Sequence, residues 1–370
     1  MDKKRYFETF DALRFFGFLC VYMAHTRVES FPVLNFFQHS GSIAVSFFFV
    51  LSGFLITYIL LYEKTNTRKI ALKEFFIRRM LRVWPLFFVM ILFAFLTPYI
   101  LHLINLGSSS EGYEPNWLVS CLFLENYKMM LTHNFPNVSP LRVMWSLCVE
   151  EHFYIIWGLA FYFAPLKKIP LVIGTALIAP CIIRVVYGHL DLPFLDIFTN
   201  LDYFAWGAIP AYCLFQRQSI IERISRLPYY FKYVIVILTL FYVLFSPHII
   251  YPFQGFMDPI LSGSLLSTII LFTLPETGRL FVKDSSILSK LGRYTYGLYL
   301  SHTIFVSLLL QLFKRLGFDM GNIMIYSCLA ILALALSIGA SILSYHLLER
   351  PFLRLKKYFT ANKAIITTLK

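Results

Sequence analysis

Long apolar stretches, separated by short polar segments, recur along the whole of this 370-residue chain. A helix needs about 20 mostly apolar residues to cross a bilayer, with a range of about 17–25. The pattern therefore predicts about ten spans. Their ranges are 10–28, 41–62, 83–105, 141–164, 169–187, 203–216, 231–246, 259–275, 295–313 and 322–346. We predict an all-α, polytopic membrane helical bundle with about ten transmembrane helices.

The segments between these spans leave no room for a soluble domain. The longest, 106–140, is rich in aromatic residues and predicts a short interfacial or re-entrant helix around 117–124. The segment 63–82 mixes basic and apolar residues and predicts an interfacial amphipathic helix before the third span. We divide the chain into a transmembrane domain, 1–352, and a short basic tail, 353–370, expected in the cytoplasm.

Composition and charge agree with a membrane protein. Hydrophobic residues make up 58% of the chain, charged residues 14%, and the mean hydropathy is +0.67. A soluble globular chain has about 25% charged residues. The net charge of +13 needs no nucleic-acid partner, because most Lys and Arg residues fall in segments that alternate spans place on one side. This positive-inside pattern predicts that both termini are cytoplasmic.

The cysteines and histidines of the sequence show no pattern typical of a disulfide framework or a metal site. The six cysteines form no CxxC pair, and only Cys121 lies clearly outside a predicted span, which argues against a disulfide framework. No stretch resembles HExxH or a nucleotide-binding glycine motif. We expect no metal site.

Arg14 and His25 are polar residues within the first span. A charge at the centre of a bilayer costs at least ~2.5–3.5 kcal/mol, so such residues need a reason. At about 100° per residue, eleven positions make about three turns plus 20°, which puts both side chains on one helix face, about 16 Å apart along the axis. Snorkelling of Arg14 and an interfacial His25 are the alternatives. The shared face favours a functional channel side, with Arg14 near the cytoplasmic entrance and His25 in the outer half.

A second polar group lies in "FFIRRMLRVWP", residues 75–85. Arg79 and Arg82 are three positions apart and therefore neighbours on a helix face, at the same predicted level as Arg14. Three guanidinium groups meeting there would suit a polyphosphate or a carboxylate, because arginine offers paired donors. Ordinary positive-inside anchoring is the alternative, and we prefer it for Arg78.

A third group lies in "WSLCVEEHFY", residues 145–154, about two turns into the fourth span. Glu150 and Glu151 point about 100° apart, so they do not both serve one small site easily. A glutamate at this depth needs a histidine or arginine partner, and His25 lies at the same level. A Glu–His pair is suited to general base catalysis, whereas an interfacial hydrogen-bond cluster is the alternative.

Three further polar residues are weaker candidates. His302 is either a core residue or a catalytic one, Asp202 is interpreted as a helix cap, and Glu349 as the end of the last span.

Together these segments resemble the acyltransferase-3 family of bacterial membrane acyltransferases, over about 10–352. "LRFFGFLCVYMAH" fits the family's R-x10-H signature, "AVSFFFVLSGFLI" is similar to its FFxLSGF span, and "RRMLRVWP" to its RxxR and proline. "WSLCVEEHFY" fits WSLxxExxFY, which singles out Glu150 over Glu151, and "LDYFAWG", "YTYGLYLSH" and "LLERP" follow in order. Asn200 departs from the family, which often has an arginine there. The supporting residues within or beside these motifs are Asp11, Ser52, Trp145, Tyr154 and His302.

The resemblance implies an acetyl-CoA-dependent O-acyltransferase of the bacterial cytoplasmic (inner) membrane. Acetyl-CoA, as co-substrate, would bind from the cytoplasm with its phosphates near Arg14, Arg79 and Arg82. His25, oriented by Glu150, would take a proton from an acceptor hydroxyl on the outer side or carry the acyl group briefly, and both routes stay open. Family members often carry a periplasmic SGNH hydrolase-like domain. None is present here through residue 370, and a hand-off of that kind would need a separate periplasmic partner.

The sequence leaves open which acceptor is used and whether the protein is an enzyme or a transporter. The acceptor is expected to be a glycan or lipid-linked sugar, such as lipopolysaccharide O-antigen, exopolysaccharide or peptidoglycan, and the acyl group acetyl or succinyl. A transporter or flippase of a glycan or lipid-linked sugar would use the same intramembrane His, Glu and Arg residues as a substrate or proton path. A scaffold or sensor would leave the buried charges unexplained.

Overall fold

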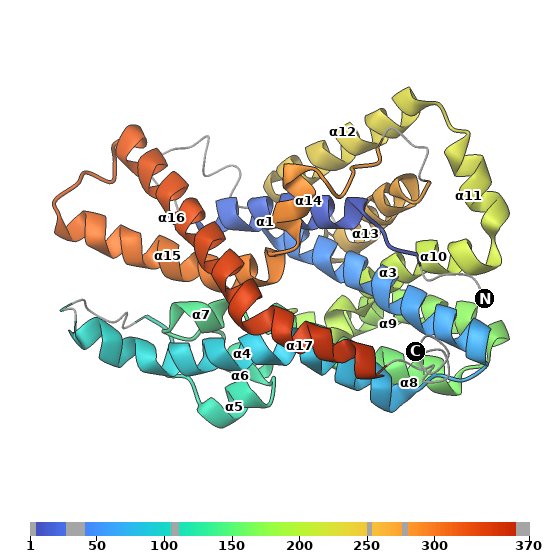
Figure 1. The fold of residues 1–370 in the computed structure, drawn as a ribbon, viewed down its shortest axis with the longest axis horizontal. Coiled ribbons are helices and arrows are strands. Elements are labelled where there is room, and N and C mark those ends of the chain that lie inside the picture. Colours follow the sequence, from blue (N-terminus) through green and yellow to red (C-terminus); the bar gives the residue numbers. More distant parts are fainter. Residues whose placement is uncertain are drawn as a thin grey trace, which may run out of the picture.

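The computed structural model describes residues 5–26, 41–103, 105, 111–249, 254–275 and 280–359, and its regular elements there are helices (Figure 1). An all-α fold is therefore confirmed for the described part of the chain. The α-helices are α1 (Thr9–His25), α3 (Gly41–Thr67), α4 (Leu72–Leu103), α5 (Trp117–Cys121), α6 (Glu125–Thr132), α7 (Ser139–Arg142), α8 (Trp145–Phe163), α9 (Ile169–His189), α10 (Ile197–Gln216), α11 (Gln218–Ser225), α12 (Tyr229–Phe245), α13 (Gln254–Thr273), α14 (Ile287–Gly292), α15 (Thr295–Arg315), α16 (Ile323–Ser344) and α17 (Arg350–Leu355).

Each of the ten predicted spans overlaps a long helix, but the count of ten is not confirmed. Within the described residues, six helices are long and apolar enough to cross a membrane, or seven if the bent pair α11–α12 is one span. The six fall on α3, α4, α9, α13, α15 and the run from α16 onward. Helices α1, α8 and α10 fall outside this set. They are also the helices that carry Arg14, Glu150 and Asp202.

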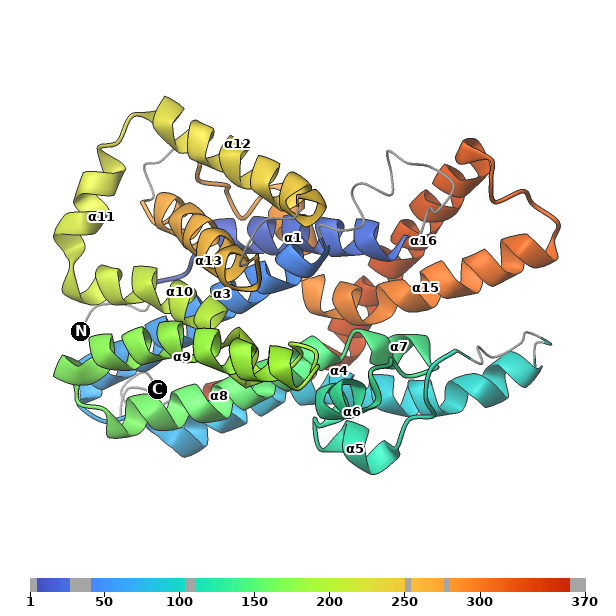
Figure 2. The same cartoon turned by 180° about the vertical axis from the view of Figure 1, so that it is seen from behind.

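Most of the long helices run roughly along the long axis of the molecule, whereas α12 and α16 cross at an angle to it (Figures 1 and 2). The connections α3–α4, α8–α9 and α10–α11, which hold many of the basic residues, lie at one end of the bundle. The α15–α16 turn lies at the opposite end, and the short helices α5–α7 lie in that half. The α3–α4, α8–α9 and α10–α11 connections, which the sequence predicts to lie in the cytoplasm, thus share one end of the bundle.

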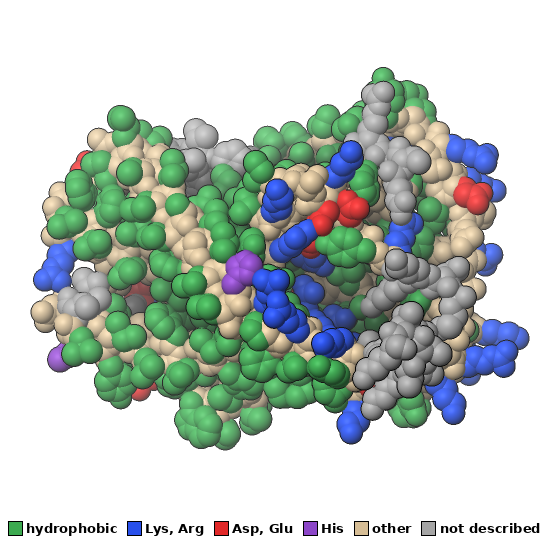
Figure 3. Space-filling model, viewed as in Figure 1, with side chains coloured by type: hydrophobic (Ala, Val, Ile, Leu, Met, Phe, Trp, Pro, Cys, Tyr) green, Lys and Arg blue, Asp and Glu red, His purple; other side chains and the backbone are tan. Residues whose placement is uncertain are grey.

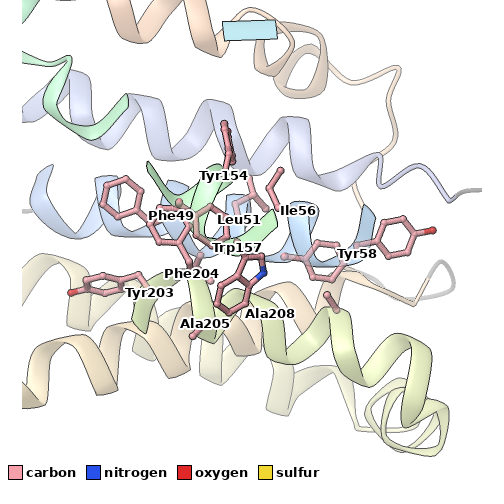
Figure 4. Close-up of a cluster of buried hydrophobic side chains, with 14 of the residues drawn as sticks. Phe49, Leu51, Ile56, Tyr58, Tyr154, Trp157, Tyr203, Phe204, Ala205 and Ala208 are labelled. Carbon is pink, nitrogen blue, oxygen red and sulfur yellow. The ribbon is translucent and has the colours of Figure 1, made fainter. Parts of the chain in front are cut away.

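The centre of the bundle is formed by α3, α8 and α10, and aromatic rings fill it (Figure 4). The Phe204 ring stacks on Phe49 and Phe153, with centroid distances of 4.8 and 3.9 Å. Trp157 donates a hydrogen bond of 2.8 Å to Thr57 Oγ1. These contacts fix α3 against α8, and with them the positions of the polar side chains that the two helices carry one turn away.

Helices α3 and α10 approach at glycines. A Cβ atom on Gly53 would collide with the Phe204 backbone, and one on Gly207 with the Val50 carbonyl. Small residues allow membrane helices to pack this closely. The "LSGF" stretch thus has a packing role beside its chemical one, since Gly53 follows directly after Ser52.

Three predicted local features are wrong. No separate interfacial helix precedes the third span, because α4 runs without a break from Leu72 to Leu103. Asp202 is not the cap of its helix: Asp196 caps α10 by accepting from the Thr199 amide. Glu349 does not end the last span, because α16 continues through a π-helical turn, Tyr345–Glu349, into α17. The short helix expected around 117–124 is confirmed as α5.

Candidate active site

The three arginines that the sequence singled out line one cavity of about 780 Å³. Helix α1 contributes Arg14 to its wall and α4 contributes Arg79 and Arg82. Figure 3 shows Lys and Arg side chains gathered around a hollow near the middle of this face of the molecule. Five further residues that the sequence singled out line the same cavity, namely Asp11, Ser52, Glu150, Tyr154 and Glu349.

The three arginines differ in how far their charge is neutralised. Arg14 forms an ion pair with Asp11, which also accepts a hydrogen bond of 2.7 Å from Tyr6. The Arg79 guanidinium lies over the Tyr154 ring, 6.0 Å from its centroid, and its buried Nε has no hydrogen-bond partner in the described part of the chain. Arg82 is exposed and, among described residues, forms no hydrogen bond or ion pair. Two guanidinium groups are therefore available to an anion in the cavity.

Glu150 lies on the cavity wall with both oxygens engaged. Ser52 Oγ donates to Oε1 at 2.9 Å and the Tyr154 hydroxyl donates to Oε2 at 3.0 Å. The positive charges of Arg82 and Arg14 lie near enough to act on this carboxylate. Glu151 does not line the cavity and instead accepts a hydrogen bond of 3.2 Å from Trp84. One carboxylate of the adjacent pair thus faces the site, as the 100° helical offset requires.

His25 lies against a second histidine. Its Nδ1 is 2.9 Å from the Val21 carbonyl and 3.3 Å from His302 Nε2. His302 is fully buried, and its Nδ1 lies 3.1 Å from the Leu298 carbonyl. A proton on Nδ1 of each ring is compatible with all three contacts, because both carbonyls can only accept. The single Nδ1 proton of His25 is then shared between the Val21 carbonyl and His302 Nε2. In this tautomer His302 Nε2 accepts from His25, and Nε2 of His25 carries the lone pair.

The histidine pair and the cavity are joined through Tyr299. The Tyr299 ring centroid is 6.0 Å from that of His302, and its hydroxyl is 2.6 Å from Ser146 Oγ. Both Tyr299 and Ser146 line the cavity, and Ser146 lies one helical turn before Glu150. Glu150 and His25 therefore lie in two neighbouring clusters rather than in the direct hydrogen bond that the sequence predicted.

Two other residues that the sequence singled out, Trp145 and Asp202, pack or pair within the protein and do not line the cavity. The Trp145 ring packs edge-on against Phe49 with a centroid distance of 6.2 Å, at the side of the aromatic core. Asp202 forms a buried two-pronged ion pair with Arg184 of α9, at 2.7 and 2.8 Å. Arg184 is therefore the positively charged partner of Asp202 in this chain, whereas Asn200 donates to the Phe194 and Asp196 carbonyls.

Sequence reasoning missed Ser146, Tyr296 and Tyr299, which also line the cavity. Their spacing held a signal: Tyr299 precedes His302 by three residues and Ser146 precedes Glu150 by four, so each shares a helix face with a residue already singled out. Arg78 was interpreted from the sequence as an ordinary positive-inside anchor. In the structure it also lines the cavity and forms an ion pair with Glu63 Oε2 at 3.2 Å.

Across the described residues, no cluster of three or more His, Cys, Asp or Glu side chains could hold a metal ion.

Comparison with known proteins gives a family for residues 7–342, which match the family model described as acyltransferase domain. The peptidoglycan O-acetyltransferase OatA of Listeria monocytogenes is 29% identical over 332 residues, 82% of this chain and 50% of that protein. A putative peptidoglycan O-acetyltransferase of Bacillus subtilis, YrhL, is 36% identical over 160 residues, 41% of this chain and 23% of that protein. A putative O-acetyltransferase of Staphylococcus aureus is 25% identical over 375 residues, 95% and 58% of the two chains.

The chain thus spans about half the length of the curated relatives that it matches over most of its own length. No solved structure matches it.

Proposed function

The chain belongs to the acyltransferase-3 family, and from this premise we propose that it is a multi-pass membrane O-acetyltransferase that moves an acetyl group from acetyl-CoA to a hydroxyl of an extracytoplasmic glycan. The proposal rests on one observation above the others. A single cavity holds Arg79 and Arg82, neither of which forms an ion pair with a described residue, and it reaches Tyr299, whose ring contacts His302 of the histidine pair. The donor phosphates and the pantetheine arm can therefore occupy one continuous space that ends at Tyr299, beside the histidine pair, although neither histidine lines the cavity.

The donor end of the cavity suits the phosphates of an acyl-CoA. Arginine binds phosphate through paired, charge-assisted donors. Arg14 is held by Asp11, which leaves Arg79 and Arg82 as the principal phosphate ligands. Apolar and aromatic side chains such as Phe10, Leu55 and Tyr58 line other parts of the wall and suit the uncharged pantetheine arm.

His25 is the proposed general base. With Nδ1 protonated and held by Val21 and His302, Nε2 accepts the proton of the acceptor hydroxyl. The freed oxygen attacks the thioester carbonyl, a C–O bond forms, and the C–S bond breaks. The CoA sulfur leaves as a thiolate and takes the proton back from His25. A route through an acyl-histidine remains the alternative, in which Nε2 itself attacks the thioester.

Glu150 is still a proposed site residue, but its contacts support a role other than the predicted one of orienting His25. Its carboxylate lies beside Arg82 and Arg14 and is held by Ser52 and Tyr154. We propose that it positions the guanidinium groups around the donor, rather than the imidazole of His25.

The acceptor and the membrane follow from the relatives' names and from the fold. Two relatives are named for peptidoglycan O-acetylation, which puts peptidoglycan ahead of O-antigen and exopolysaccharide among the acceptors that we consider. The apolar helices and the positively charged end of the bundle support a place in the bacterial cytoplasmic (inner) membrane.

The test is transfer of labelled acetyl from acetyl-CoA to glycan fragments by the purified protein in lipid discs. His25→Ala should lower kcat by about 10²–10⁴-fold, the usual contribution of a general base. His189→Ala is the matched control, because His189 makes the same Nδ1 contact to a carbonyl four residues back, at 2.9 Å, but is exposed and does not line the cavity.

Full transfer by His25→Ala would refute the catalytic role of this residue. An absence of transfer with every acceptor, together with movement of a labelled glycan across the membrane, would favour the transporter alternative.

A further inference from the structure

One wall of the cavity is built by residues that follow the family match, which ends at residue 342. Tyr345, Glu349, Leu353, Lys356 and Lys357 line it. Tyr345, Glu349 and Leu353 are four residues apart, and Lys356 and Lys357 follow Leu353 by three and four, so all five lie on or beside one face of a helix. They come from the π-helical turn Tyr345–Glu349, α17 and the 3₁₀ turn η4 (Lys356–Phe359). Single π turns within helices are frequent at functional sites.

This segment is held in place at the start of α4. Arg78 donates from Nη1 to the Phe359 carbonyl at 2.6 Å and pairs through Nη2 with Glu63 Oε2 at 3.2 Å. Figure 1 shows α17 crossing over α4. Lys356 is half-buried and Lys357 is exposed. Because Arg78 holds Phe359, two residues after Lys357, the two lysines have a defined place on the cavity wall.

The order of charges along α4 gives the cavity a direction. Phe359, next to the lysines, contacts Arg78. Glu150 is closest electrostatically to Arg82, one turn further along α4. Tyr299 and the histidine pair lie beyond Glu150 through Ser146. The lysines therefore occupy the end of the cavity remote from the proposed base.

An acyl-CoA has its thioester at one end and the 3′-phosphate of its adenosine at the other. We propose that the 345–357 wall forms the subsite for that 3′-phosphate, with Lys356 and Lys357 as its cationic ligands. The inference rests on the proposed function, since it assigns the far end of the same donor. Arg350 and Arg354 of α17 are also exposed but do not line the cavity, so the segment presents two basic faces and only one of them reaches the donor.

The experiment compares the affinity of CoA with that of 3′-dephospho-CoA, by titration calorimetry on the full chain in discs of neutral phosphatidylcholine. The unmodified protein should prefer CoA by about tenfold, the usual effect of a charge-assisted contact at a partly exposed site. K356A/K357A should lose that preference and keep its affinity for 3′-dephospho-CoA. R350A/R354A removes the same charge from the other face and should keep the preference.

Three results would overturn the subsite. They are a preference that survives K356A/K357A, an equal loss in R350A/R354A, and a preference abolished by phosphatidylglycerol in the discs, which would assign the lysines to lipid headgroups. Failure of the proposed function looks different, because the unmodified protein would then bind neither nucleotide and acetyl-CoA would not compete with a bound probe.

Discussion

The contact between His25 and His302 joins a residue of the first long helix to one near the end of the chain. His302 sits between the rings of Phe18 and Tyr22 of α1 and Tyr299 of its own helix, with centroid distances of 5.6–6.3 Å. Its Nδ1 is committed to Leu298, which leaves only Nε2 to meet His25. The buried ring therefore sets the orientation and the tautomer of the proposed base without touching a substrate.

Replacing His302 separates this positioning role from donor binding. His302→Leu should lower kcat by about tenfold, less than loss of the base itself, and leave KM for acetyl-CoA unchanged, because the arginines lie in the other cluster. His302→Gln can still offer an acceptor to His25 Nδ1 and should recover part of kcat. Steady-state kinetics on the three proteins give the comparison.

The positioning role would be ruled out by full activity in His302→Leu, or by a rise in KM that Gln does not reverse, which indicates a general packing defect.

Residue spacing predicted the arginine cluster of the cavity but not the contact between His25 and His302. Arg79 and Arg82 are neighbours on one helix, and that local rule placed both on the cavity wall. The partner of His25 depends on how α1 packs against α15, nearly 280 positions along the chain, and no local pattern carries that distance. The depth argument matched His25 with Glu150 because both lie in the outer part of their spans, but side-chain direction decided otherwise.

At the scale of the element, the close approach of α3 to α10 holds Ser52 on the cavity wall. Gly53→Ala should force the two backbones apart and destabilise the protein by about 1–3 kcal/mol, the usual cost of overpacking. Gly174→Ala is the matched control, since a Cβ there meets nothing within 4 Å and a helical alanine is favourable. Thermal unfolding in detergent measures both.

An unchanged melting temperature in Gly53→Ala would show that α3 and α10 can slide apart freely, contrary to this packing.

Apolar length located the helices well and their ends less well. All ten predicted spans fall on helices, yet α4 begins eleven residues before its predicted span because Lys73, Arg78 and Arg79 interrupt the hydropathy without breaking the helix. The helix after α16 was missed because Glu349 was expected to end the last span. Pro351 does not stop the helix, because it lies in the first turn of α17, where a missing N–H costs nothing.

The whole molecule has one strongly basic end, and its sidedness can be tested by labelling. In a background without the six native cysteines, Leu131→Cys lies on α6 and Lys167→Cys lies in the α8–α9 connection, and both positions are exposed. A membrane-impermeant maleimide should label Leu131→Cys in intact cells and Lys167→Cys only after permeabilisation, because basic connections stay in the cytoplasm.

The reverse labelling order would contradict the predicted topology and would show that the donor enters from the opposite side of the membrane. Labelling of both positions in intact cells would show that Lys167 does not lie on the cytoplasmic side.

On the proposed function, the cavity's basic groups would face the part of the donor that the reaction leaves untouched. Acetyl-CoA and free CoA carry the same phosphates, so Arg79 and Arg82 would hold the product CoA as firmly as acetyl-CoA. Product release would then be a slow step, and free CoA would compete for the site throughout turnover. Acetylation on the outside of the cell would follow the ratio of acetyl-CoA to CoA inside it, which couples a surface modification to the carbon supply of the cytoplasm.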